Sequence, residues 1–493
     1  MAGRCGVKAK DDNGLVASTS EAQYSWTSSG LDFLVYLDRD ARRPGAALQH
    51  AVRDAIRSGS LRPGDPLPST RALASDLGLA RGTVVEAYEQ LGAEGWLLTR
   101  QGRRTVVAGL PPMPPEPAEP RAVPAPDHDL RPGHADPSSF PRQAWAAVMR
   151  RVLAEAPDEA FGYADPRGRA ELRAALAGYL GRVRAVRATA AAVQVCAGAG
   201  HGLGIAFRAV AALGARTVAV EDPSSPRMRE IAAATGMAVL ALPCDDLGAR
   251  TDALSGLGVD AVVVTPAHQY PLGMTLGPRR RAELIAWADD SGGMIIEDDY
   301  DGELRYDRQP VGALQALNPG RVIYVGTTSK SLAAALRVGW LVLPAQLLGV
   351  VADTIRVINA WPSSLEQLAL ARFIESGNFD RHIRRMRGIY RQRRDLLAAT
   401  LASRAPMLQI TGIAAGGHAL VRMPPGGPGE RDVVARAALA GLALDGLDNY
   451  RVSDAELPGP ALVIGYGSPA GRSYRAAVAA LGEFLQSIYP LDD

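Results

Sequence analysis

The sequence predicts a two-part protein, a small α+β domain followed by a large α/β domain with a mostly parallel sheet. A proline-rich segment at 109–127, read as a semi-rigid linker, separates the two regions. Helical and hairpin patterns occupy 31–108, after a polar stretch at 1–30 that predicts a disordered tail. From 128 to 493, short apolar strands alternate with helices, which is typical of a parallel sheet covered on both faces.

Apolar runs bounded by turn residues place the elements of the large domain. They predict strands at 217–220, 261–265, 294–297, 321–325 and 339–343, with helices between them such as 226–235 and 279–289. From about 380 the pattern changes to a long helix and then to strands around 408–422 and 461–466. This change indicates a smaller C-terminal subdomain.

Composition excludes several classes of protein. No apolar run approaches the ~20 residues that span a bilayer, and the N-terminus has no apolar leader, so we expect a cytoplasmic protein without a membrane partner. The three cysteines are too scattered for a disulfide framework or a zinc site, and we expect no metal. The net charge of +2 does not by itself indicate nucleic acid.

The small domain has the pattern of a winged helix-turn-helix. Helical spacing over 48–56 is followed by a short helix that Ser69 caps and Gly78 ends. A third helix starts near Arg81, and strands at 96–99 and 105–108 form a hairpin. In this geometry the second helix of the motif enters the major groove of DNA.

Arginines lie where such a domain would contact phosphates. Over 41–104 there are ten arginines against six acidic residues, and Arg100, Arg103 and Arg104 crowd the hairpin. The alternative is a small helical domain whose arginines only solvate its surface. The stretch LPSTRALASDLGLARGTVVEAYEQLGAEGWL closely resembles the GntR-type winged-helix domain. The resemblance implies that Arg71, Arg81 and Thr83 contact double-stranded operator DNA.

The wing departs from the family pattern at one position. Gly102 matches the wing glycine of the GntR-type domain, but Arg104 stands where a second glycine is usual. An arginine there stiffens the turn and adds a cation for a phosphate. We therefore expect Arg103 and Arg104 to bind the DNA backbone.

Lysine is nearly absent from the chain. Apart from Lys8 and Lys10, Lys330 is the only lysine, although lysine and arginine together number 54. Arginine stays protonated and cannot act as an amine nucleophile, whereas lysine forms Schiff bases. Either Lys330 survived by chance on the surface, or it is kept for that chemistry.

The neighbours of Lys330 favour chemistry. Thr327 and Ser329 flank it directly after a predicted strand, and Arg337 follows. At the end of another strand, Asp298 could pair with a protonated pyridine nitrogen and Tyr300 with a ring oxygen. The stretch CAGAGHGLG opens a helix whose backbone amides could hold a phosphate.

These stretches resemble the fold-type I aminotransferases, and most closely the aminotransferase-like half of MocR/GabR-type regulators. The markers are LRPGHADPSSFPRQAW, FGYADPRG, TPAHQYPLG, EDDYDGELRY and TTSKSLAAALRVGW. The resemblance implies pyridoxal 5'-phosphate as cofactor, with Lys330 as its internal aldimine, and a homodimer in which Tyr163 reaches the partner's site. The implied cofactor-binding residues are Lys330, Asp298, Tyr300, Thr327, Ser329, Arg337, Ala199, Gly200, Tyr163 and His268.

Departures from the aminotransferase pattern concern the substrate side. Ser225 replaces an aromatic that stacks on the cofactor, and the asparagine of NPTG is missing from the YPLG at 270–273. Asn449 stands where relatives carry an arginine that binds a substrate carboxylate, although Arg451 or Arg422 could compensate. The leading hypothesis is thus a transcriptional regulator that senses pyridoxal phosphate or an amine that forms an aldimine with it. Its rivals are an active aminotransferase that carries a DNA-binding domain, and a regulator that has lost the cofactor.

Overall fold

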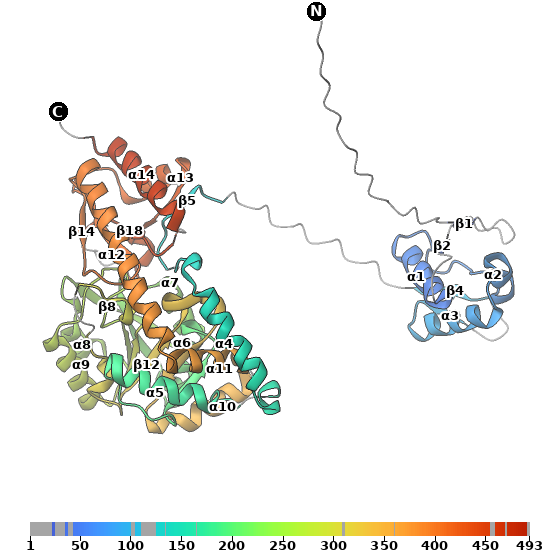
Figure 1. Cartoon of the computed structure of the whole chain (residues 1–493), viewed down its shortest axis with the longest axis horizontal. Coiled ribbons are helices and arrows are strands. Elements are labelled where there is room, and N and C mark those ends of the chain that lie inside the picture. Colours follow the sequence, from blue (N-terminus) through green and yellow to red (C-terminus); the bar gives the residue numbers. More distant parts are fainter. Residues whose placement is uncertain are drawn as a thin grey trace, which may run out of the picture. The chain divides into compact units, whose positions relative to one another are not determined.

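The computed structural model describes residues 43–99, 104–109, 125–133, 135–163, 165–307, 311–358, 360–453, 459–468 and 471–490, together with the strands 22–24 and 35–37. It divides into two compact units, Met1–Ala122 and Val123–Asp493, which are described separately (Figure 1). In the described part of the chain, no helix is long and apolar enough to cross a membrane.

The small unit holds three helices and a short hairpin. They are α1 (Pro44–Arg57), α2 (Thr70–Leu77), α3 (Arg81–Ala93), and the antiparallel pair β3 (Leu97–Leu98) and β4 (Val106–Val107). The Ser69 hydroxyl accepts from the Ala72 amide, and Gly78 ends α2 at φ 66°. Leu48, Leu73 and Leu91 come from the three helices and are buried in one core. The predicted cap, turn and hairpin are therefore present.

The predicted tail at 1–30 and linker at 109–127 lie mostly outside the described residues. The exception near the N-terminus is β1 (Ala22–Tyr24), which pairs antiparallel with β2 (Val35–Leu37). The sequence pattern did not predict this pair.

An eight-stranded sheet forms the centre of the large unit. Its order is β6-β13-β12-β11-β10-β7-β8-β9. The strands are β6 (Val193–Cys196), β7 (Thr217–Asp222), β8 (Ala238–Asp245), β9 (Gly248–Ala249), β10 (Ala261–Val264), β11 (Met294–Asp298), β12 (Val322–Thr327) and β13 (Gly339–Val342). Strands β8, β7, β10, β11 and β12 run parallel, and β13 is antiparallel to both of its neighbours.

Alternate residues of the central strands face two different cores, as expected for a sheet covered on both sides. In β11, Ile296 joins the cluster that includes Phe207 of α6 (Ala199–Ala212). Its neighbour Ile295 joins the cluster that includes Leu284 of α9 (Pro278–Ser291). The remaining helices of this part are α4 (Arg142–Glu155), α5 (Ala170–Arg184), α7 (Pro226–Ala233), α8 (Leu254–Leu257), α10 (Leu348–Ile358) and α11 (Ser364–Glu375).

The C-terminal part begins with the long helix α12 (Asn378–Arg404), which crosses the large unit in Figure 1. It leads to a four-stranded sheet in the order β14-β15-β18-β17. The strands are β14 (Gln409–Thr411), β15 (His418–Arg422), β17 (Asp445–Gly446) and β18 (Ala461–Gly465), with helices α13 (Glu430–Leu439) and α14 (Gly471–Ile488). A separate pair, β5 (His128–Asp129) with β16 (Leu442–Ala443), attaches the first described residues of the large unit to this part.

Candidate functional site

Three of the predicted site residues of the large unit lie at or directly after the carboxyl ends of neighbouring strands. Asp298 ends β11 and Thr327 ends the neighbouring parallel strand β12. His268 lies in the loop that follows β10, which pairs with β11 on its other side. Carboxyl ends of parallel strands lie on the same side of a sheet, where α/β proteins bind ligands.

Lys330 follows β12 in a single turn of π-helix, Ser329–Ala333. Its Nζ donates a hydrogen bond to the carbonyl oxygen of Gly133. Burial of the amine lowers the pKa of Lys330, while Asp301 and Asp298 oppose the shift. A larger fraction of this amine is therefore unprotonated and nucleophilic than in a solvated lysine.

Three consecutive acidic residues, Glu297, Asp298 and Asp299, lie at the end of β11, and they make different contacts. Both carboxylate oxygens of Glu297 accept backbone amides, those of Leu314 and Gln315, at 2.8 Å. Asp299 forms an ion pair with the fully buried Arg184 at 2.7 Å, so it has a structural role.

The third acidic residue is Asp298. The side chain is buried, and its Oδ1 has no hydrogen-bond partner among the described residues. Burial, and then the charge of Asp299, raise the pKa of Asp298 to about 7. A buried acceptor without a partner is costly, and a protonated ring nitrogen is a donor that would satisfy it.

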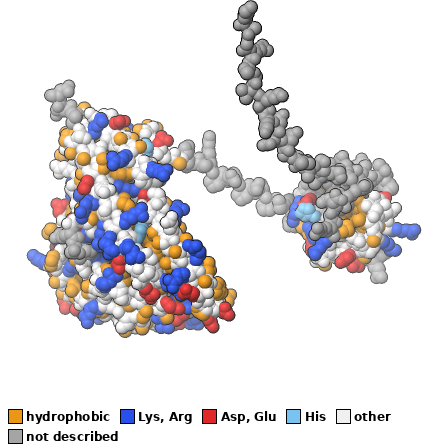
Figure 2. Space-filling view, viewed as in Figure 1, with side chains coloured by type: hydrophobic (Ala, Val, Ile, Leu, Met, Phe, Trp, Pro, Cys, Tyr) orange, Lys and Arg blue, Asp and Glu red, His pale blue; other side chains and the backbone are white. Residues whose placement is uncertain are grey.

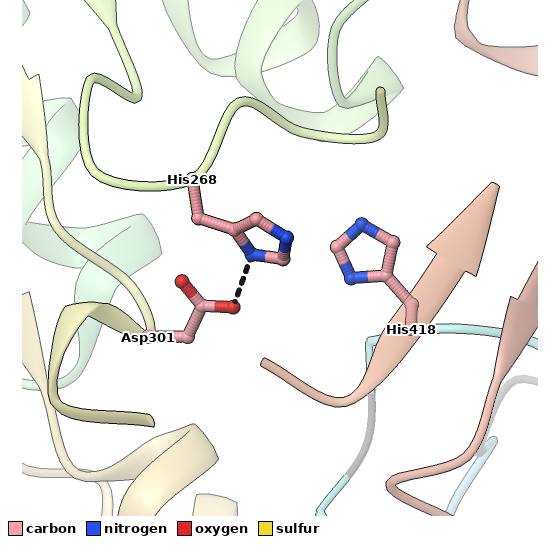
Figure 3. A group of neighbouring side chains, drawn as sticks. All are labelled: His268, Asp301 and His418. Atoms are coloured by element: carbon pink, nitrogen blue, oxygen red, sulfur yellow. Dashed lines mark hydrogen bonds and ion pairs between the residues drawn. The ribbon is translucent and has the colours of Figure 1, made fainter. Parts of the chain in front are cut away.

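His268, Asp301 and His418 form a buried group (Figure 3), and Tyr300 contacts His268. The Tyr300 hydroxyl donates to the His268 carbonyl oxygen at 3.0 Å, and the Nδ1 of His268 lies 2.8 Å from Asp301 Oδ2. The rings of His268 and His418 are 4.9 Å apart. The ligand atoms of His268, Asp301 and His418 lie within 4.8 Å of one another, so this group could also hold a metal ion.

The start of α6 has the features of a phosphate site. Gly198 precedes it at φ 88°, and the first amides of the helix, from Ala199 and Gly200, have no intrahelical acceptor. A Cβ at Gly339 would lie 2.8 Å from the Gly198 backbone, so glycine is required for this close approach. The Thr327 and Ser329 hydroxyls are 2.9 Å apart.

Two arginines approach this helix start from different segments. Arg337, in the left-handed conformation at φ 52°, is exposed, and its charge lowers the pKa of His201 in the first turn of α6 after the larger effect of burial. The guanidinium of Arg227 would lie 3.1 Å from a Cβ at Gly200. No sequence motif indicated a role for Arg227.

None of the predicted substrate-side residues is among the described residues that line the cavity beside Lys330. Asn449 is exposed, and Ser225 precedes α7 as its N-cap. Arg451 pairs with Asp448 at 2.6 Å, and Arg422 with Asp246 at 2.9 Å. A small cavity of about 30 Å³ lies beside Lys330, and no arginine is among the described residues that line it: Gly133, Ala135, Tyr270, Tyr300, Asp301, Leu304, Lys330, Tyr390, Gly417 and His418.

The DNA-binding candidates are accessible in the small unit. Arg71, near the start of α2, and Arg81, the first residue of α3, are exposed, and Thr83 is half-buried one turn further on. Arg104 is exposed before β4. Arg103 and Gly102 lie outside the described residues.

Comparisons with known proteins match both units. Residues 44–107 match the model of the bacterial regulatory proteins of the gntR family, and 134–424 match that of aminotransferase class I and II. The chain is 35% identical over 379 residues, 76% of its length and 82% of the other protein, to the HTH-type pyridoxine biosynthesis transcriptional regulator PdxR of Corynebacterium glutamicum. It is 33% identical to the probable rhizopine catabolism regulatory protein MocR of Rhizobium meliloti, over 74% of this chain and 79% of that one.

The chain belongs to the MocR/GabR-type regulators. Members of this family join a GntR-type helix-turn-helix domain to an aminotransferase-like domain, and the homologues are transcriptional regulators. The fold of the second domain is that of fold-type I aminotransferases. The kynurenine aminotransferase of Pyrococcus horikoshii, for example, aligns with a TM-score of 0.66 and 23% identity over 73% of this chain and 90% of that one.

In this MocR/GabR-type chain, the substitution Asp298→Asn tests how the buried carboxyl of Asp298 affects stability. Its pKa of about 7 lies above the ordinary value near 4, so the folded state binds this proton more tightly than the unfolded chain does. The buried carboxyl therefore lowers the free energy of unfolding progressively as the pH rises from about 4 to about 7. Above that range the whole of this reduction remains. We expect the variant without cofactor to gain up to a few kcal/mol in free energy of unfolding at pH 8, and much less at pH 5.

Urea unfolding of the cofactor-free proteins at both pH values measures this difference. Asp246→Asn, which changes an exposed carboxyl, is the control. A gain of the same size at pH 5 and pH 8 would show that the raised pKa is not the cause.

Proposed function

We propose that this regulator binds pyridoxal 5'-phosphate at Lys330 and senses the cofactor or an amine that condenses with it. The observation that supports this most is the buried Asp298, whose Oδ1 has no hydrogen-bond partner in the part of the chain that the structure describes. It lies at the same end of the sheet as a lysine with a lowered pKa. An amine, an acid for a ring nitrogen and a phosphate cradle are the groups that this cofactor requires. Their presence argues against the hypothesis that the chain has lost it.

Each residue has a separate task in this proposal. Lys330 would supply the amine that binds the cofactor aldehyde, Asp298 would hold the protonated ring nitrogen, and Tyr300 would donate to the ring 3-oxygen. The Tyr300 hydroxyl has a single proton, so it would turn from the His268 carbonyl to this oxygen, while the Nδ1 of His268, which lies beside Asp301, stays 3.0 Å from the hydroxyl oxygen. When bound, pyridoxal phosphate supplies a reactive carbonyl carbon, which gives the protein a chemical means of recognising amines.

The phosphate would lie at the start of α6. The amides of Ala199 and Gly200, the hydroxyls of Thr327 and Ser329, and the guanidinium of Arg337 supply donors there. Arg227 is an additional candidate, because it already approaches Gly200.

A route from the cofactor to the DNA-binding domain starts at Gly133. Its carbonyl accepts the Lys330 amine, and Gly133 follows shortly after β5, the first strand beyond the predicted linker. Cofactor attachment uses the same nitrogen, so it removes or weakens this contact. A ligand shifts an equilibrium only if it binds the two states unequally, and this contact supplies such a difference.

The small domain would place α3 in the major groove of an operator, with Arg71, Arg81, Thr83, Arg103 and Arg104 as contacts. We also propose a homodimer in which Tyr163 reaches the partner's site. Tyr163 is 96% exposed and Phe161 is 59% exposed. Large apolar side chains that protrude in this way fit a contact surface.

The effector class follows from the lining of the cavity. None of the described residues that line it is an arginine that could bind a carboxylate in bidentate fashion, which favours the cofactor or a simple amine over an α-amino acid. The relatives' names divide between pyridoxine biosynthesis and rhizopine catabolism. The gene order around this regulator would distinguish the two cases.

We expect transamination of ordinary α-amino acids to be slow or undetectable. Without an arginine clamp, the bond to be broken is not held in the reactive orientation, and Arg451 and Arg422 are engaged by carboxylates. Steady-state assays across the common amino acids, with 2-oxoglutarate or pyruvate as acceptor, measure this activity. Turnover at ~1 s⁻¹ or faster, the low end of usual enzyme rates, would favour the aminotransferase alternative.

A further inference from the structure

Helix α12 carries a row of arginines on its outer face. The helix contains eight arginines and two aspartates. Its inner face is buried through Ile383, Met386, Tyr390 and Leu397, at helical spacing. Arg384 and Arg391 are exposed on the opposite face, with the half-buried Arg387 between them.

These arginines line a groove of about 650 Å³ together with Arg305, Tyr306, Asp307 and Gly388. Four arginines and one aspartate give the lining a net charge of +3. Asp307 pairs with Arg305 at 2.7 Å. Among the described residues no ion pair involves Arg384, Arg387 or Arg391, although the carboxylates of Glu303 and Asp380 lie near enough to oppose the lowering of the pKa of Arg387 by burial.

Two of the cations are held in place by backbone carbonyls. Arg387 Nε donates to the Glu303 oxygen at 2.6 Å, and Arg391 donates to the Tyr306 oxygen. Because these contacts restrain the side chains, less conformational entropy remains to be lost on binding an anion.

We propose that the α12 groove, defined by Arg384, Arg387 and Arg391, binds the phosphate backbone of DNA. Seven residues of α-helix separate Arg384 from Arg391, about 10 Å along the axis. Each strand of duplex DNA presents one phosphate charge per ~3.4 Å of the axis, so a strand that lies along α12 meets this row with about three phosphates. Figure 2 shows Lys and Arg side chains gathered over the middle of the large unit, where Figure 1 places α12.

The chemistry favours a polyphosphate over a small anion or an acidic protein. Arginine forks match phosphate oxygens, and the groove is open along the helix rather than closed around one ligand. Because the other domain of the chain is a DNA-binding one, duplex DNA is already the partner of the full protein. Phosphate contacts carry no sequence information, so this surface adds affinity and orientation, not specificity.

The test uses the full-length protein and random-sequence duplexes of about 20 and about 60 base pairs, since phosphate binding requires no operator. The variant is Arg384→Gln/Arg391→Gln, and Arg384→Lys/Arg391→Lys restores the charges. Arg279→Gln/Arg436→Gln is a control that removes the same net charge from exposed arginines on α9 and α13. The readouts are the dissociation constant and its dependence on salt.

On the longer duplex we expect the glutamine pair to reduce the slope of log K against log salt by about 2 and to weaken binding roughly tenfold. The lysine pair should recover most of the loss, and the control should lose little. Arg384→Gln alone, which breaks no hydrogen bond within the described chain, should reduce the slope by about 1. Arg81→Ala should instead weaken binding to the operator. The two sets of variants therefore distinguish a failure of this proposal from a failure of the proposed DNA binding by the small domain.

An unchanged slope in the glutamine pair, or an equal loss in the control, would overturn the proposal. So would a glutamine pair that loses binding to polyglutamate but binds the long duplex as before. That outcome would assign the groove to an acidic protein partner.

Discussion

Lys330→Ala protein mixed with pyridoxal phosphate should show no visible absorption band from attached cofactor and no mass increase after borohydride reduction. The reason is chemical: Lys330 is the only lysine beyond residue 10, so no other ε-amine of the large unit can attack the aldehyde. The wild-type protein should gain the mass of one cofactor per chain. Absorption spectra and intact-protein mass measure both quantities.

Two further variants are matched controls. The first tests whether the loss of attachment is due to the lost amine or to the lost charge, and the second tests whether the cofactor reacts with the other two lysines. Lys330→Arg keeps a cation beside Asp298 and Asp301 but cannot form the covalent bond, so it should behave like Lys330→Ala. Lys8→Arg/Lys10→Arg removes the other two lysines and should keep full attachment. A band and mass increase that persist in Lys330→Ala would refute the assignment.

The sequence identified Lys330 because this chain uses arginine almost everywhere else. The positions of the other residues were a second signal. Asp298 and Thr327 end strands whose limits the apolar pattern predicted to within one or two residues. Parallel strands put such ends on one sheet edge, so two distant motifs could be assigned to one site. The helix ends at Ser69 and Gly78 were predictable for a local reason, because capping depends on neighbouring backbone groups.

Other site residues left no local signal. Gly133, Arg227 and His418 reach the site from segments far from Lys330 in the sequence, and only the packed fold brings them together. Asp301 is part of the quoted EDDYDGE, but its partner His268 lies 33 residues earlier. A side chain of ordinary type in an ordinary segment becomes functional only through such long-range contacts.

The missed elements have similar causes. Strand β6 is four residues long and includes Gln194, and β8 contains Pro243, a residue that usually argues against a strand. The antiparallel direction of β13 also could not be predicted, because direction depends on the connection and not on the hydrophobic pattern. These omissions did not hide the site, because the glycine-rich stretch after β6 and the ends of β11 and β12 were recognised from their own residues.

Arg81→Ala should reduce operator affinity by about 1–3 kcal/mol and erode sequence preference, because Arg81 is exposed at the start of α3, where residues reach base edges. Arg104→Gln should act differently. Its side chain is exposed beside the wing, and a lost phosphate contact weakens all sequences alike and reduces the salt slope by about 1. Arg103→Gln, at a position outside the described residues, should resemble Arg104→Gln.

Titrations of the full-length variants with an operator fragment and a scrambled fragment, at several salt concentrations, distinguish these roles. The quantity that decides is the ratio of the two affinities. It should fall for Arg81→Ala and stay constant for Arg104→Gln, because only base contacts differ between the fragments. Exposed Arg150 on α4, replaced by glutamine, is a control that should leave both the ratio and the salt slope unchanged. Unchanged affinity in all three DNA-binding variants would remove the winged-helix docking geometry, since no arginine near α3 or the wing would then contact DNA.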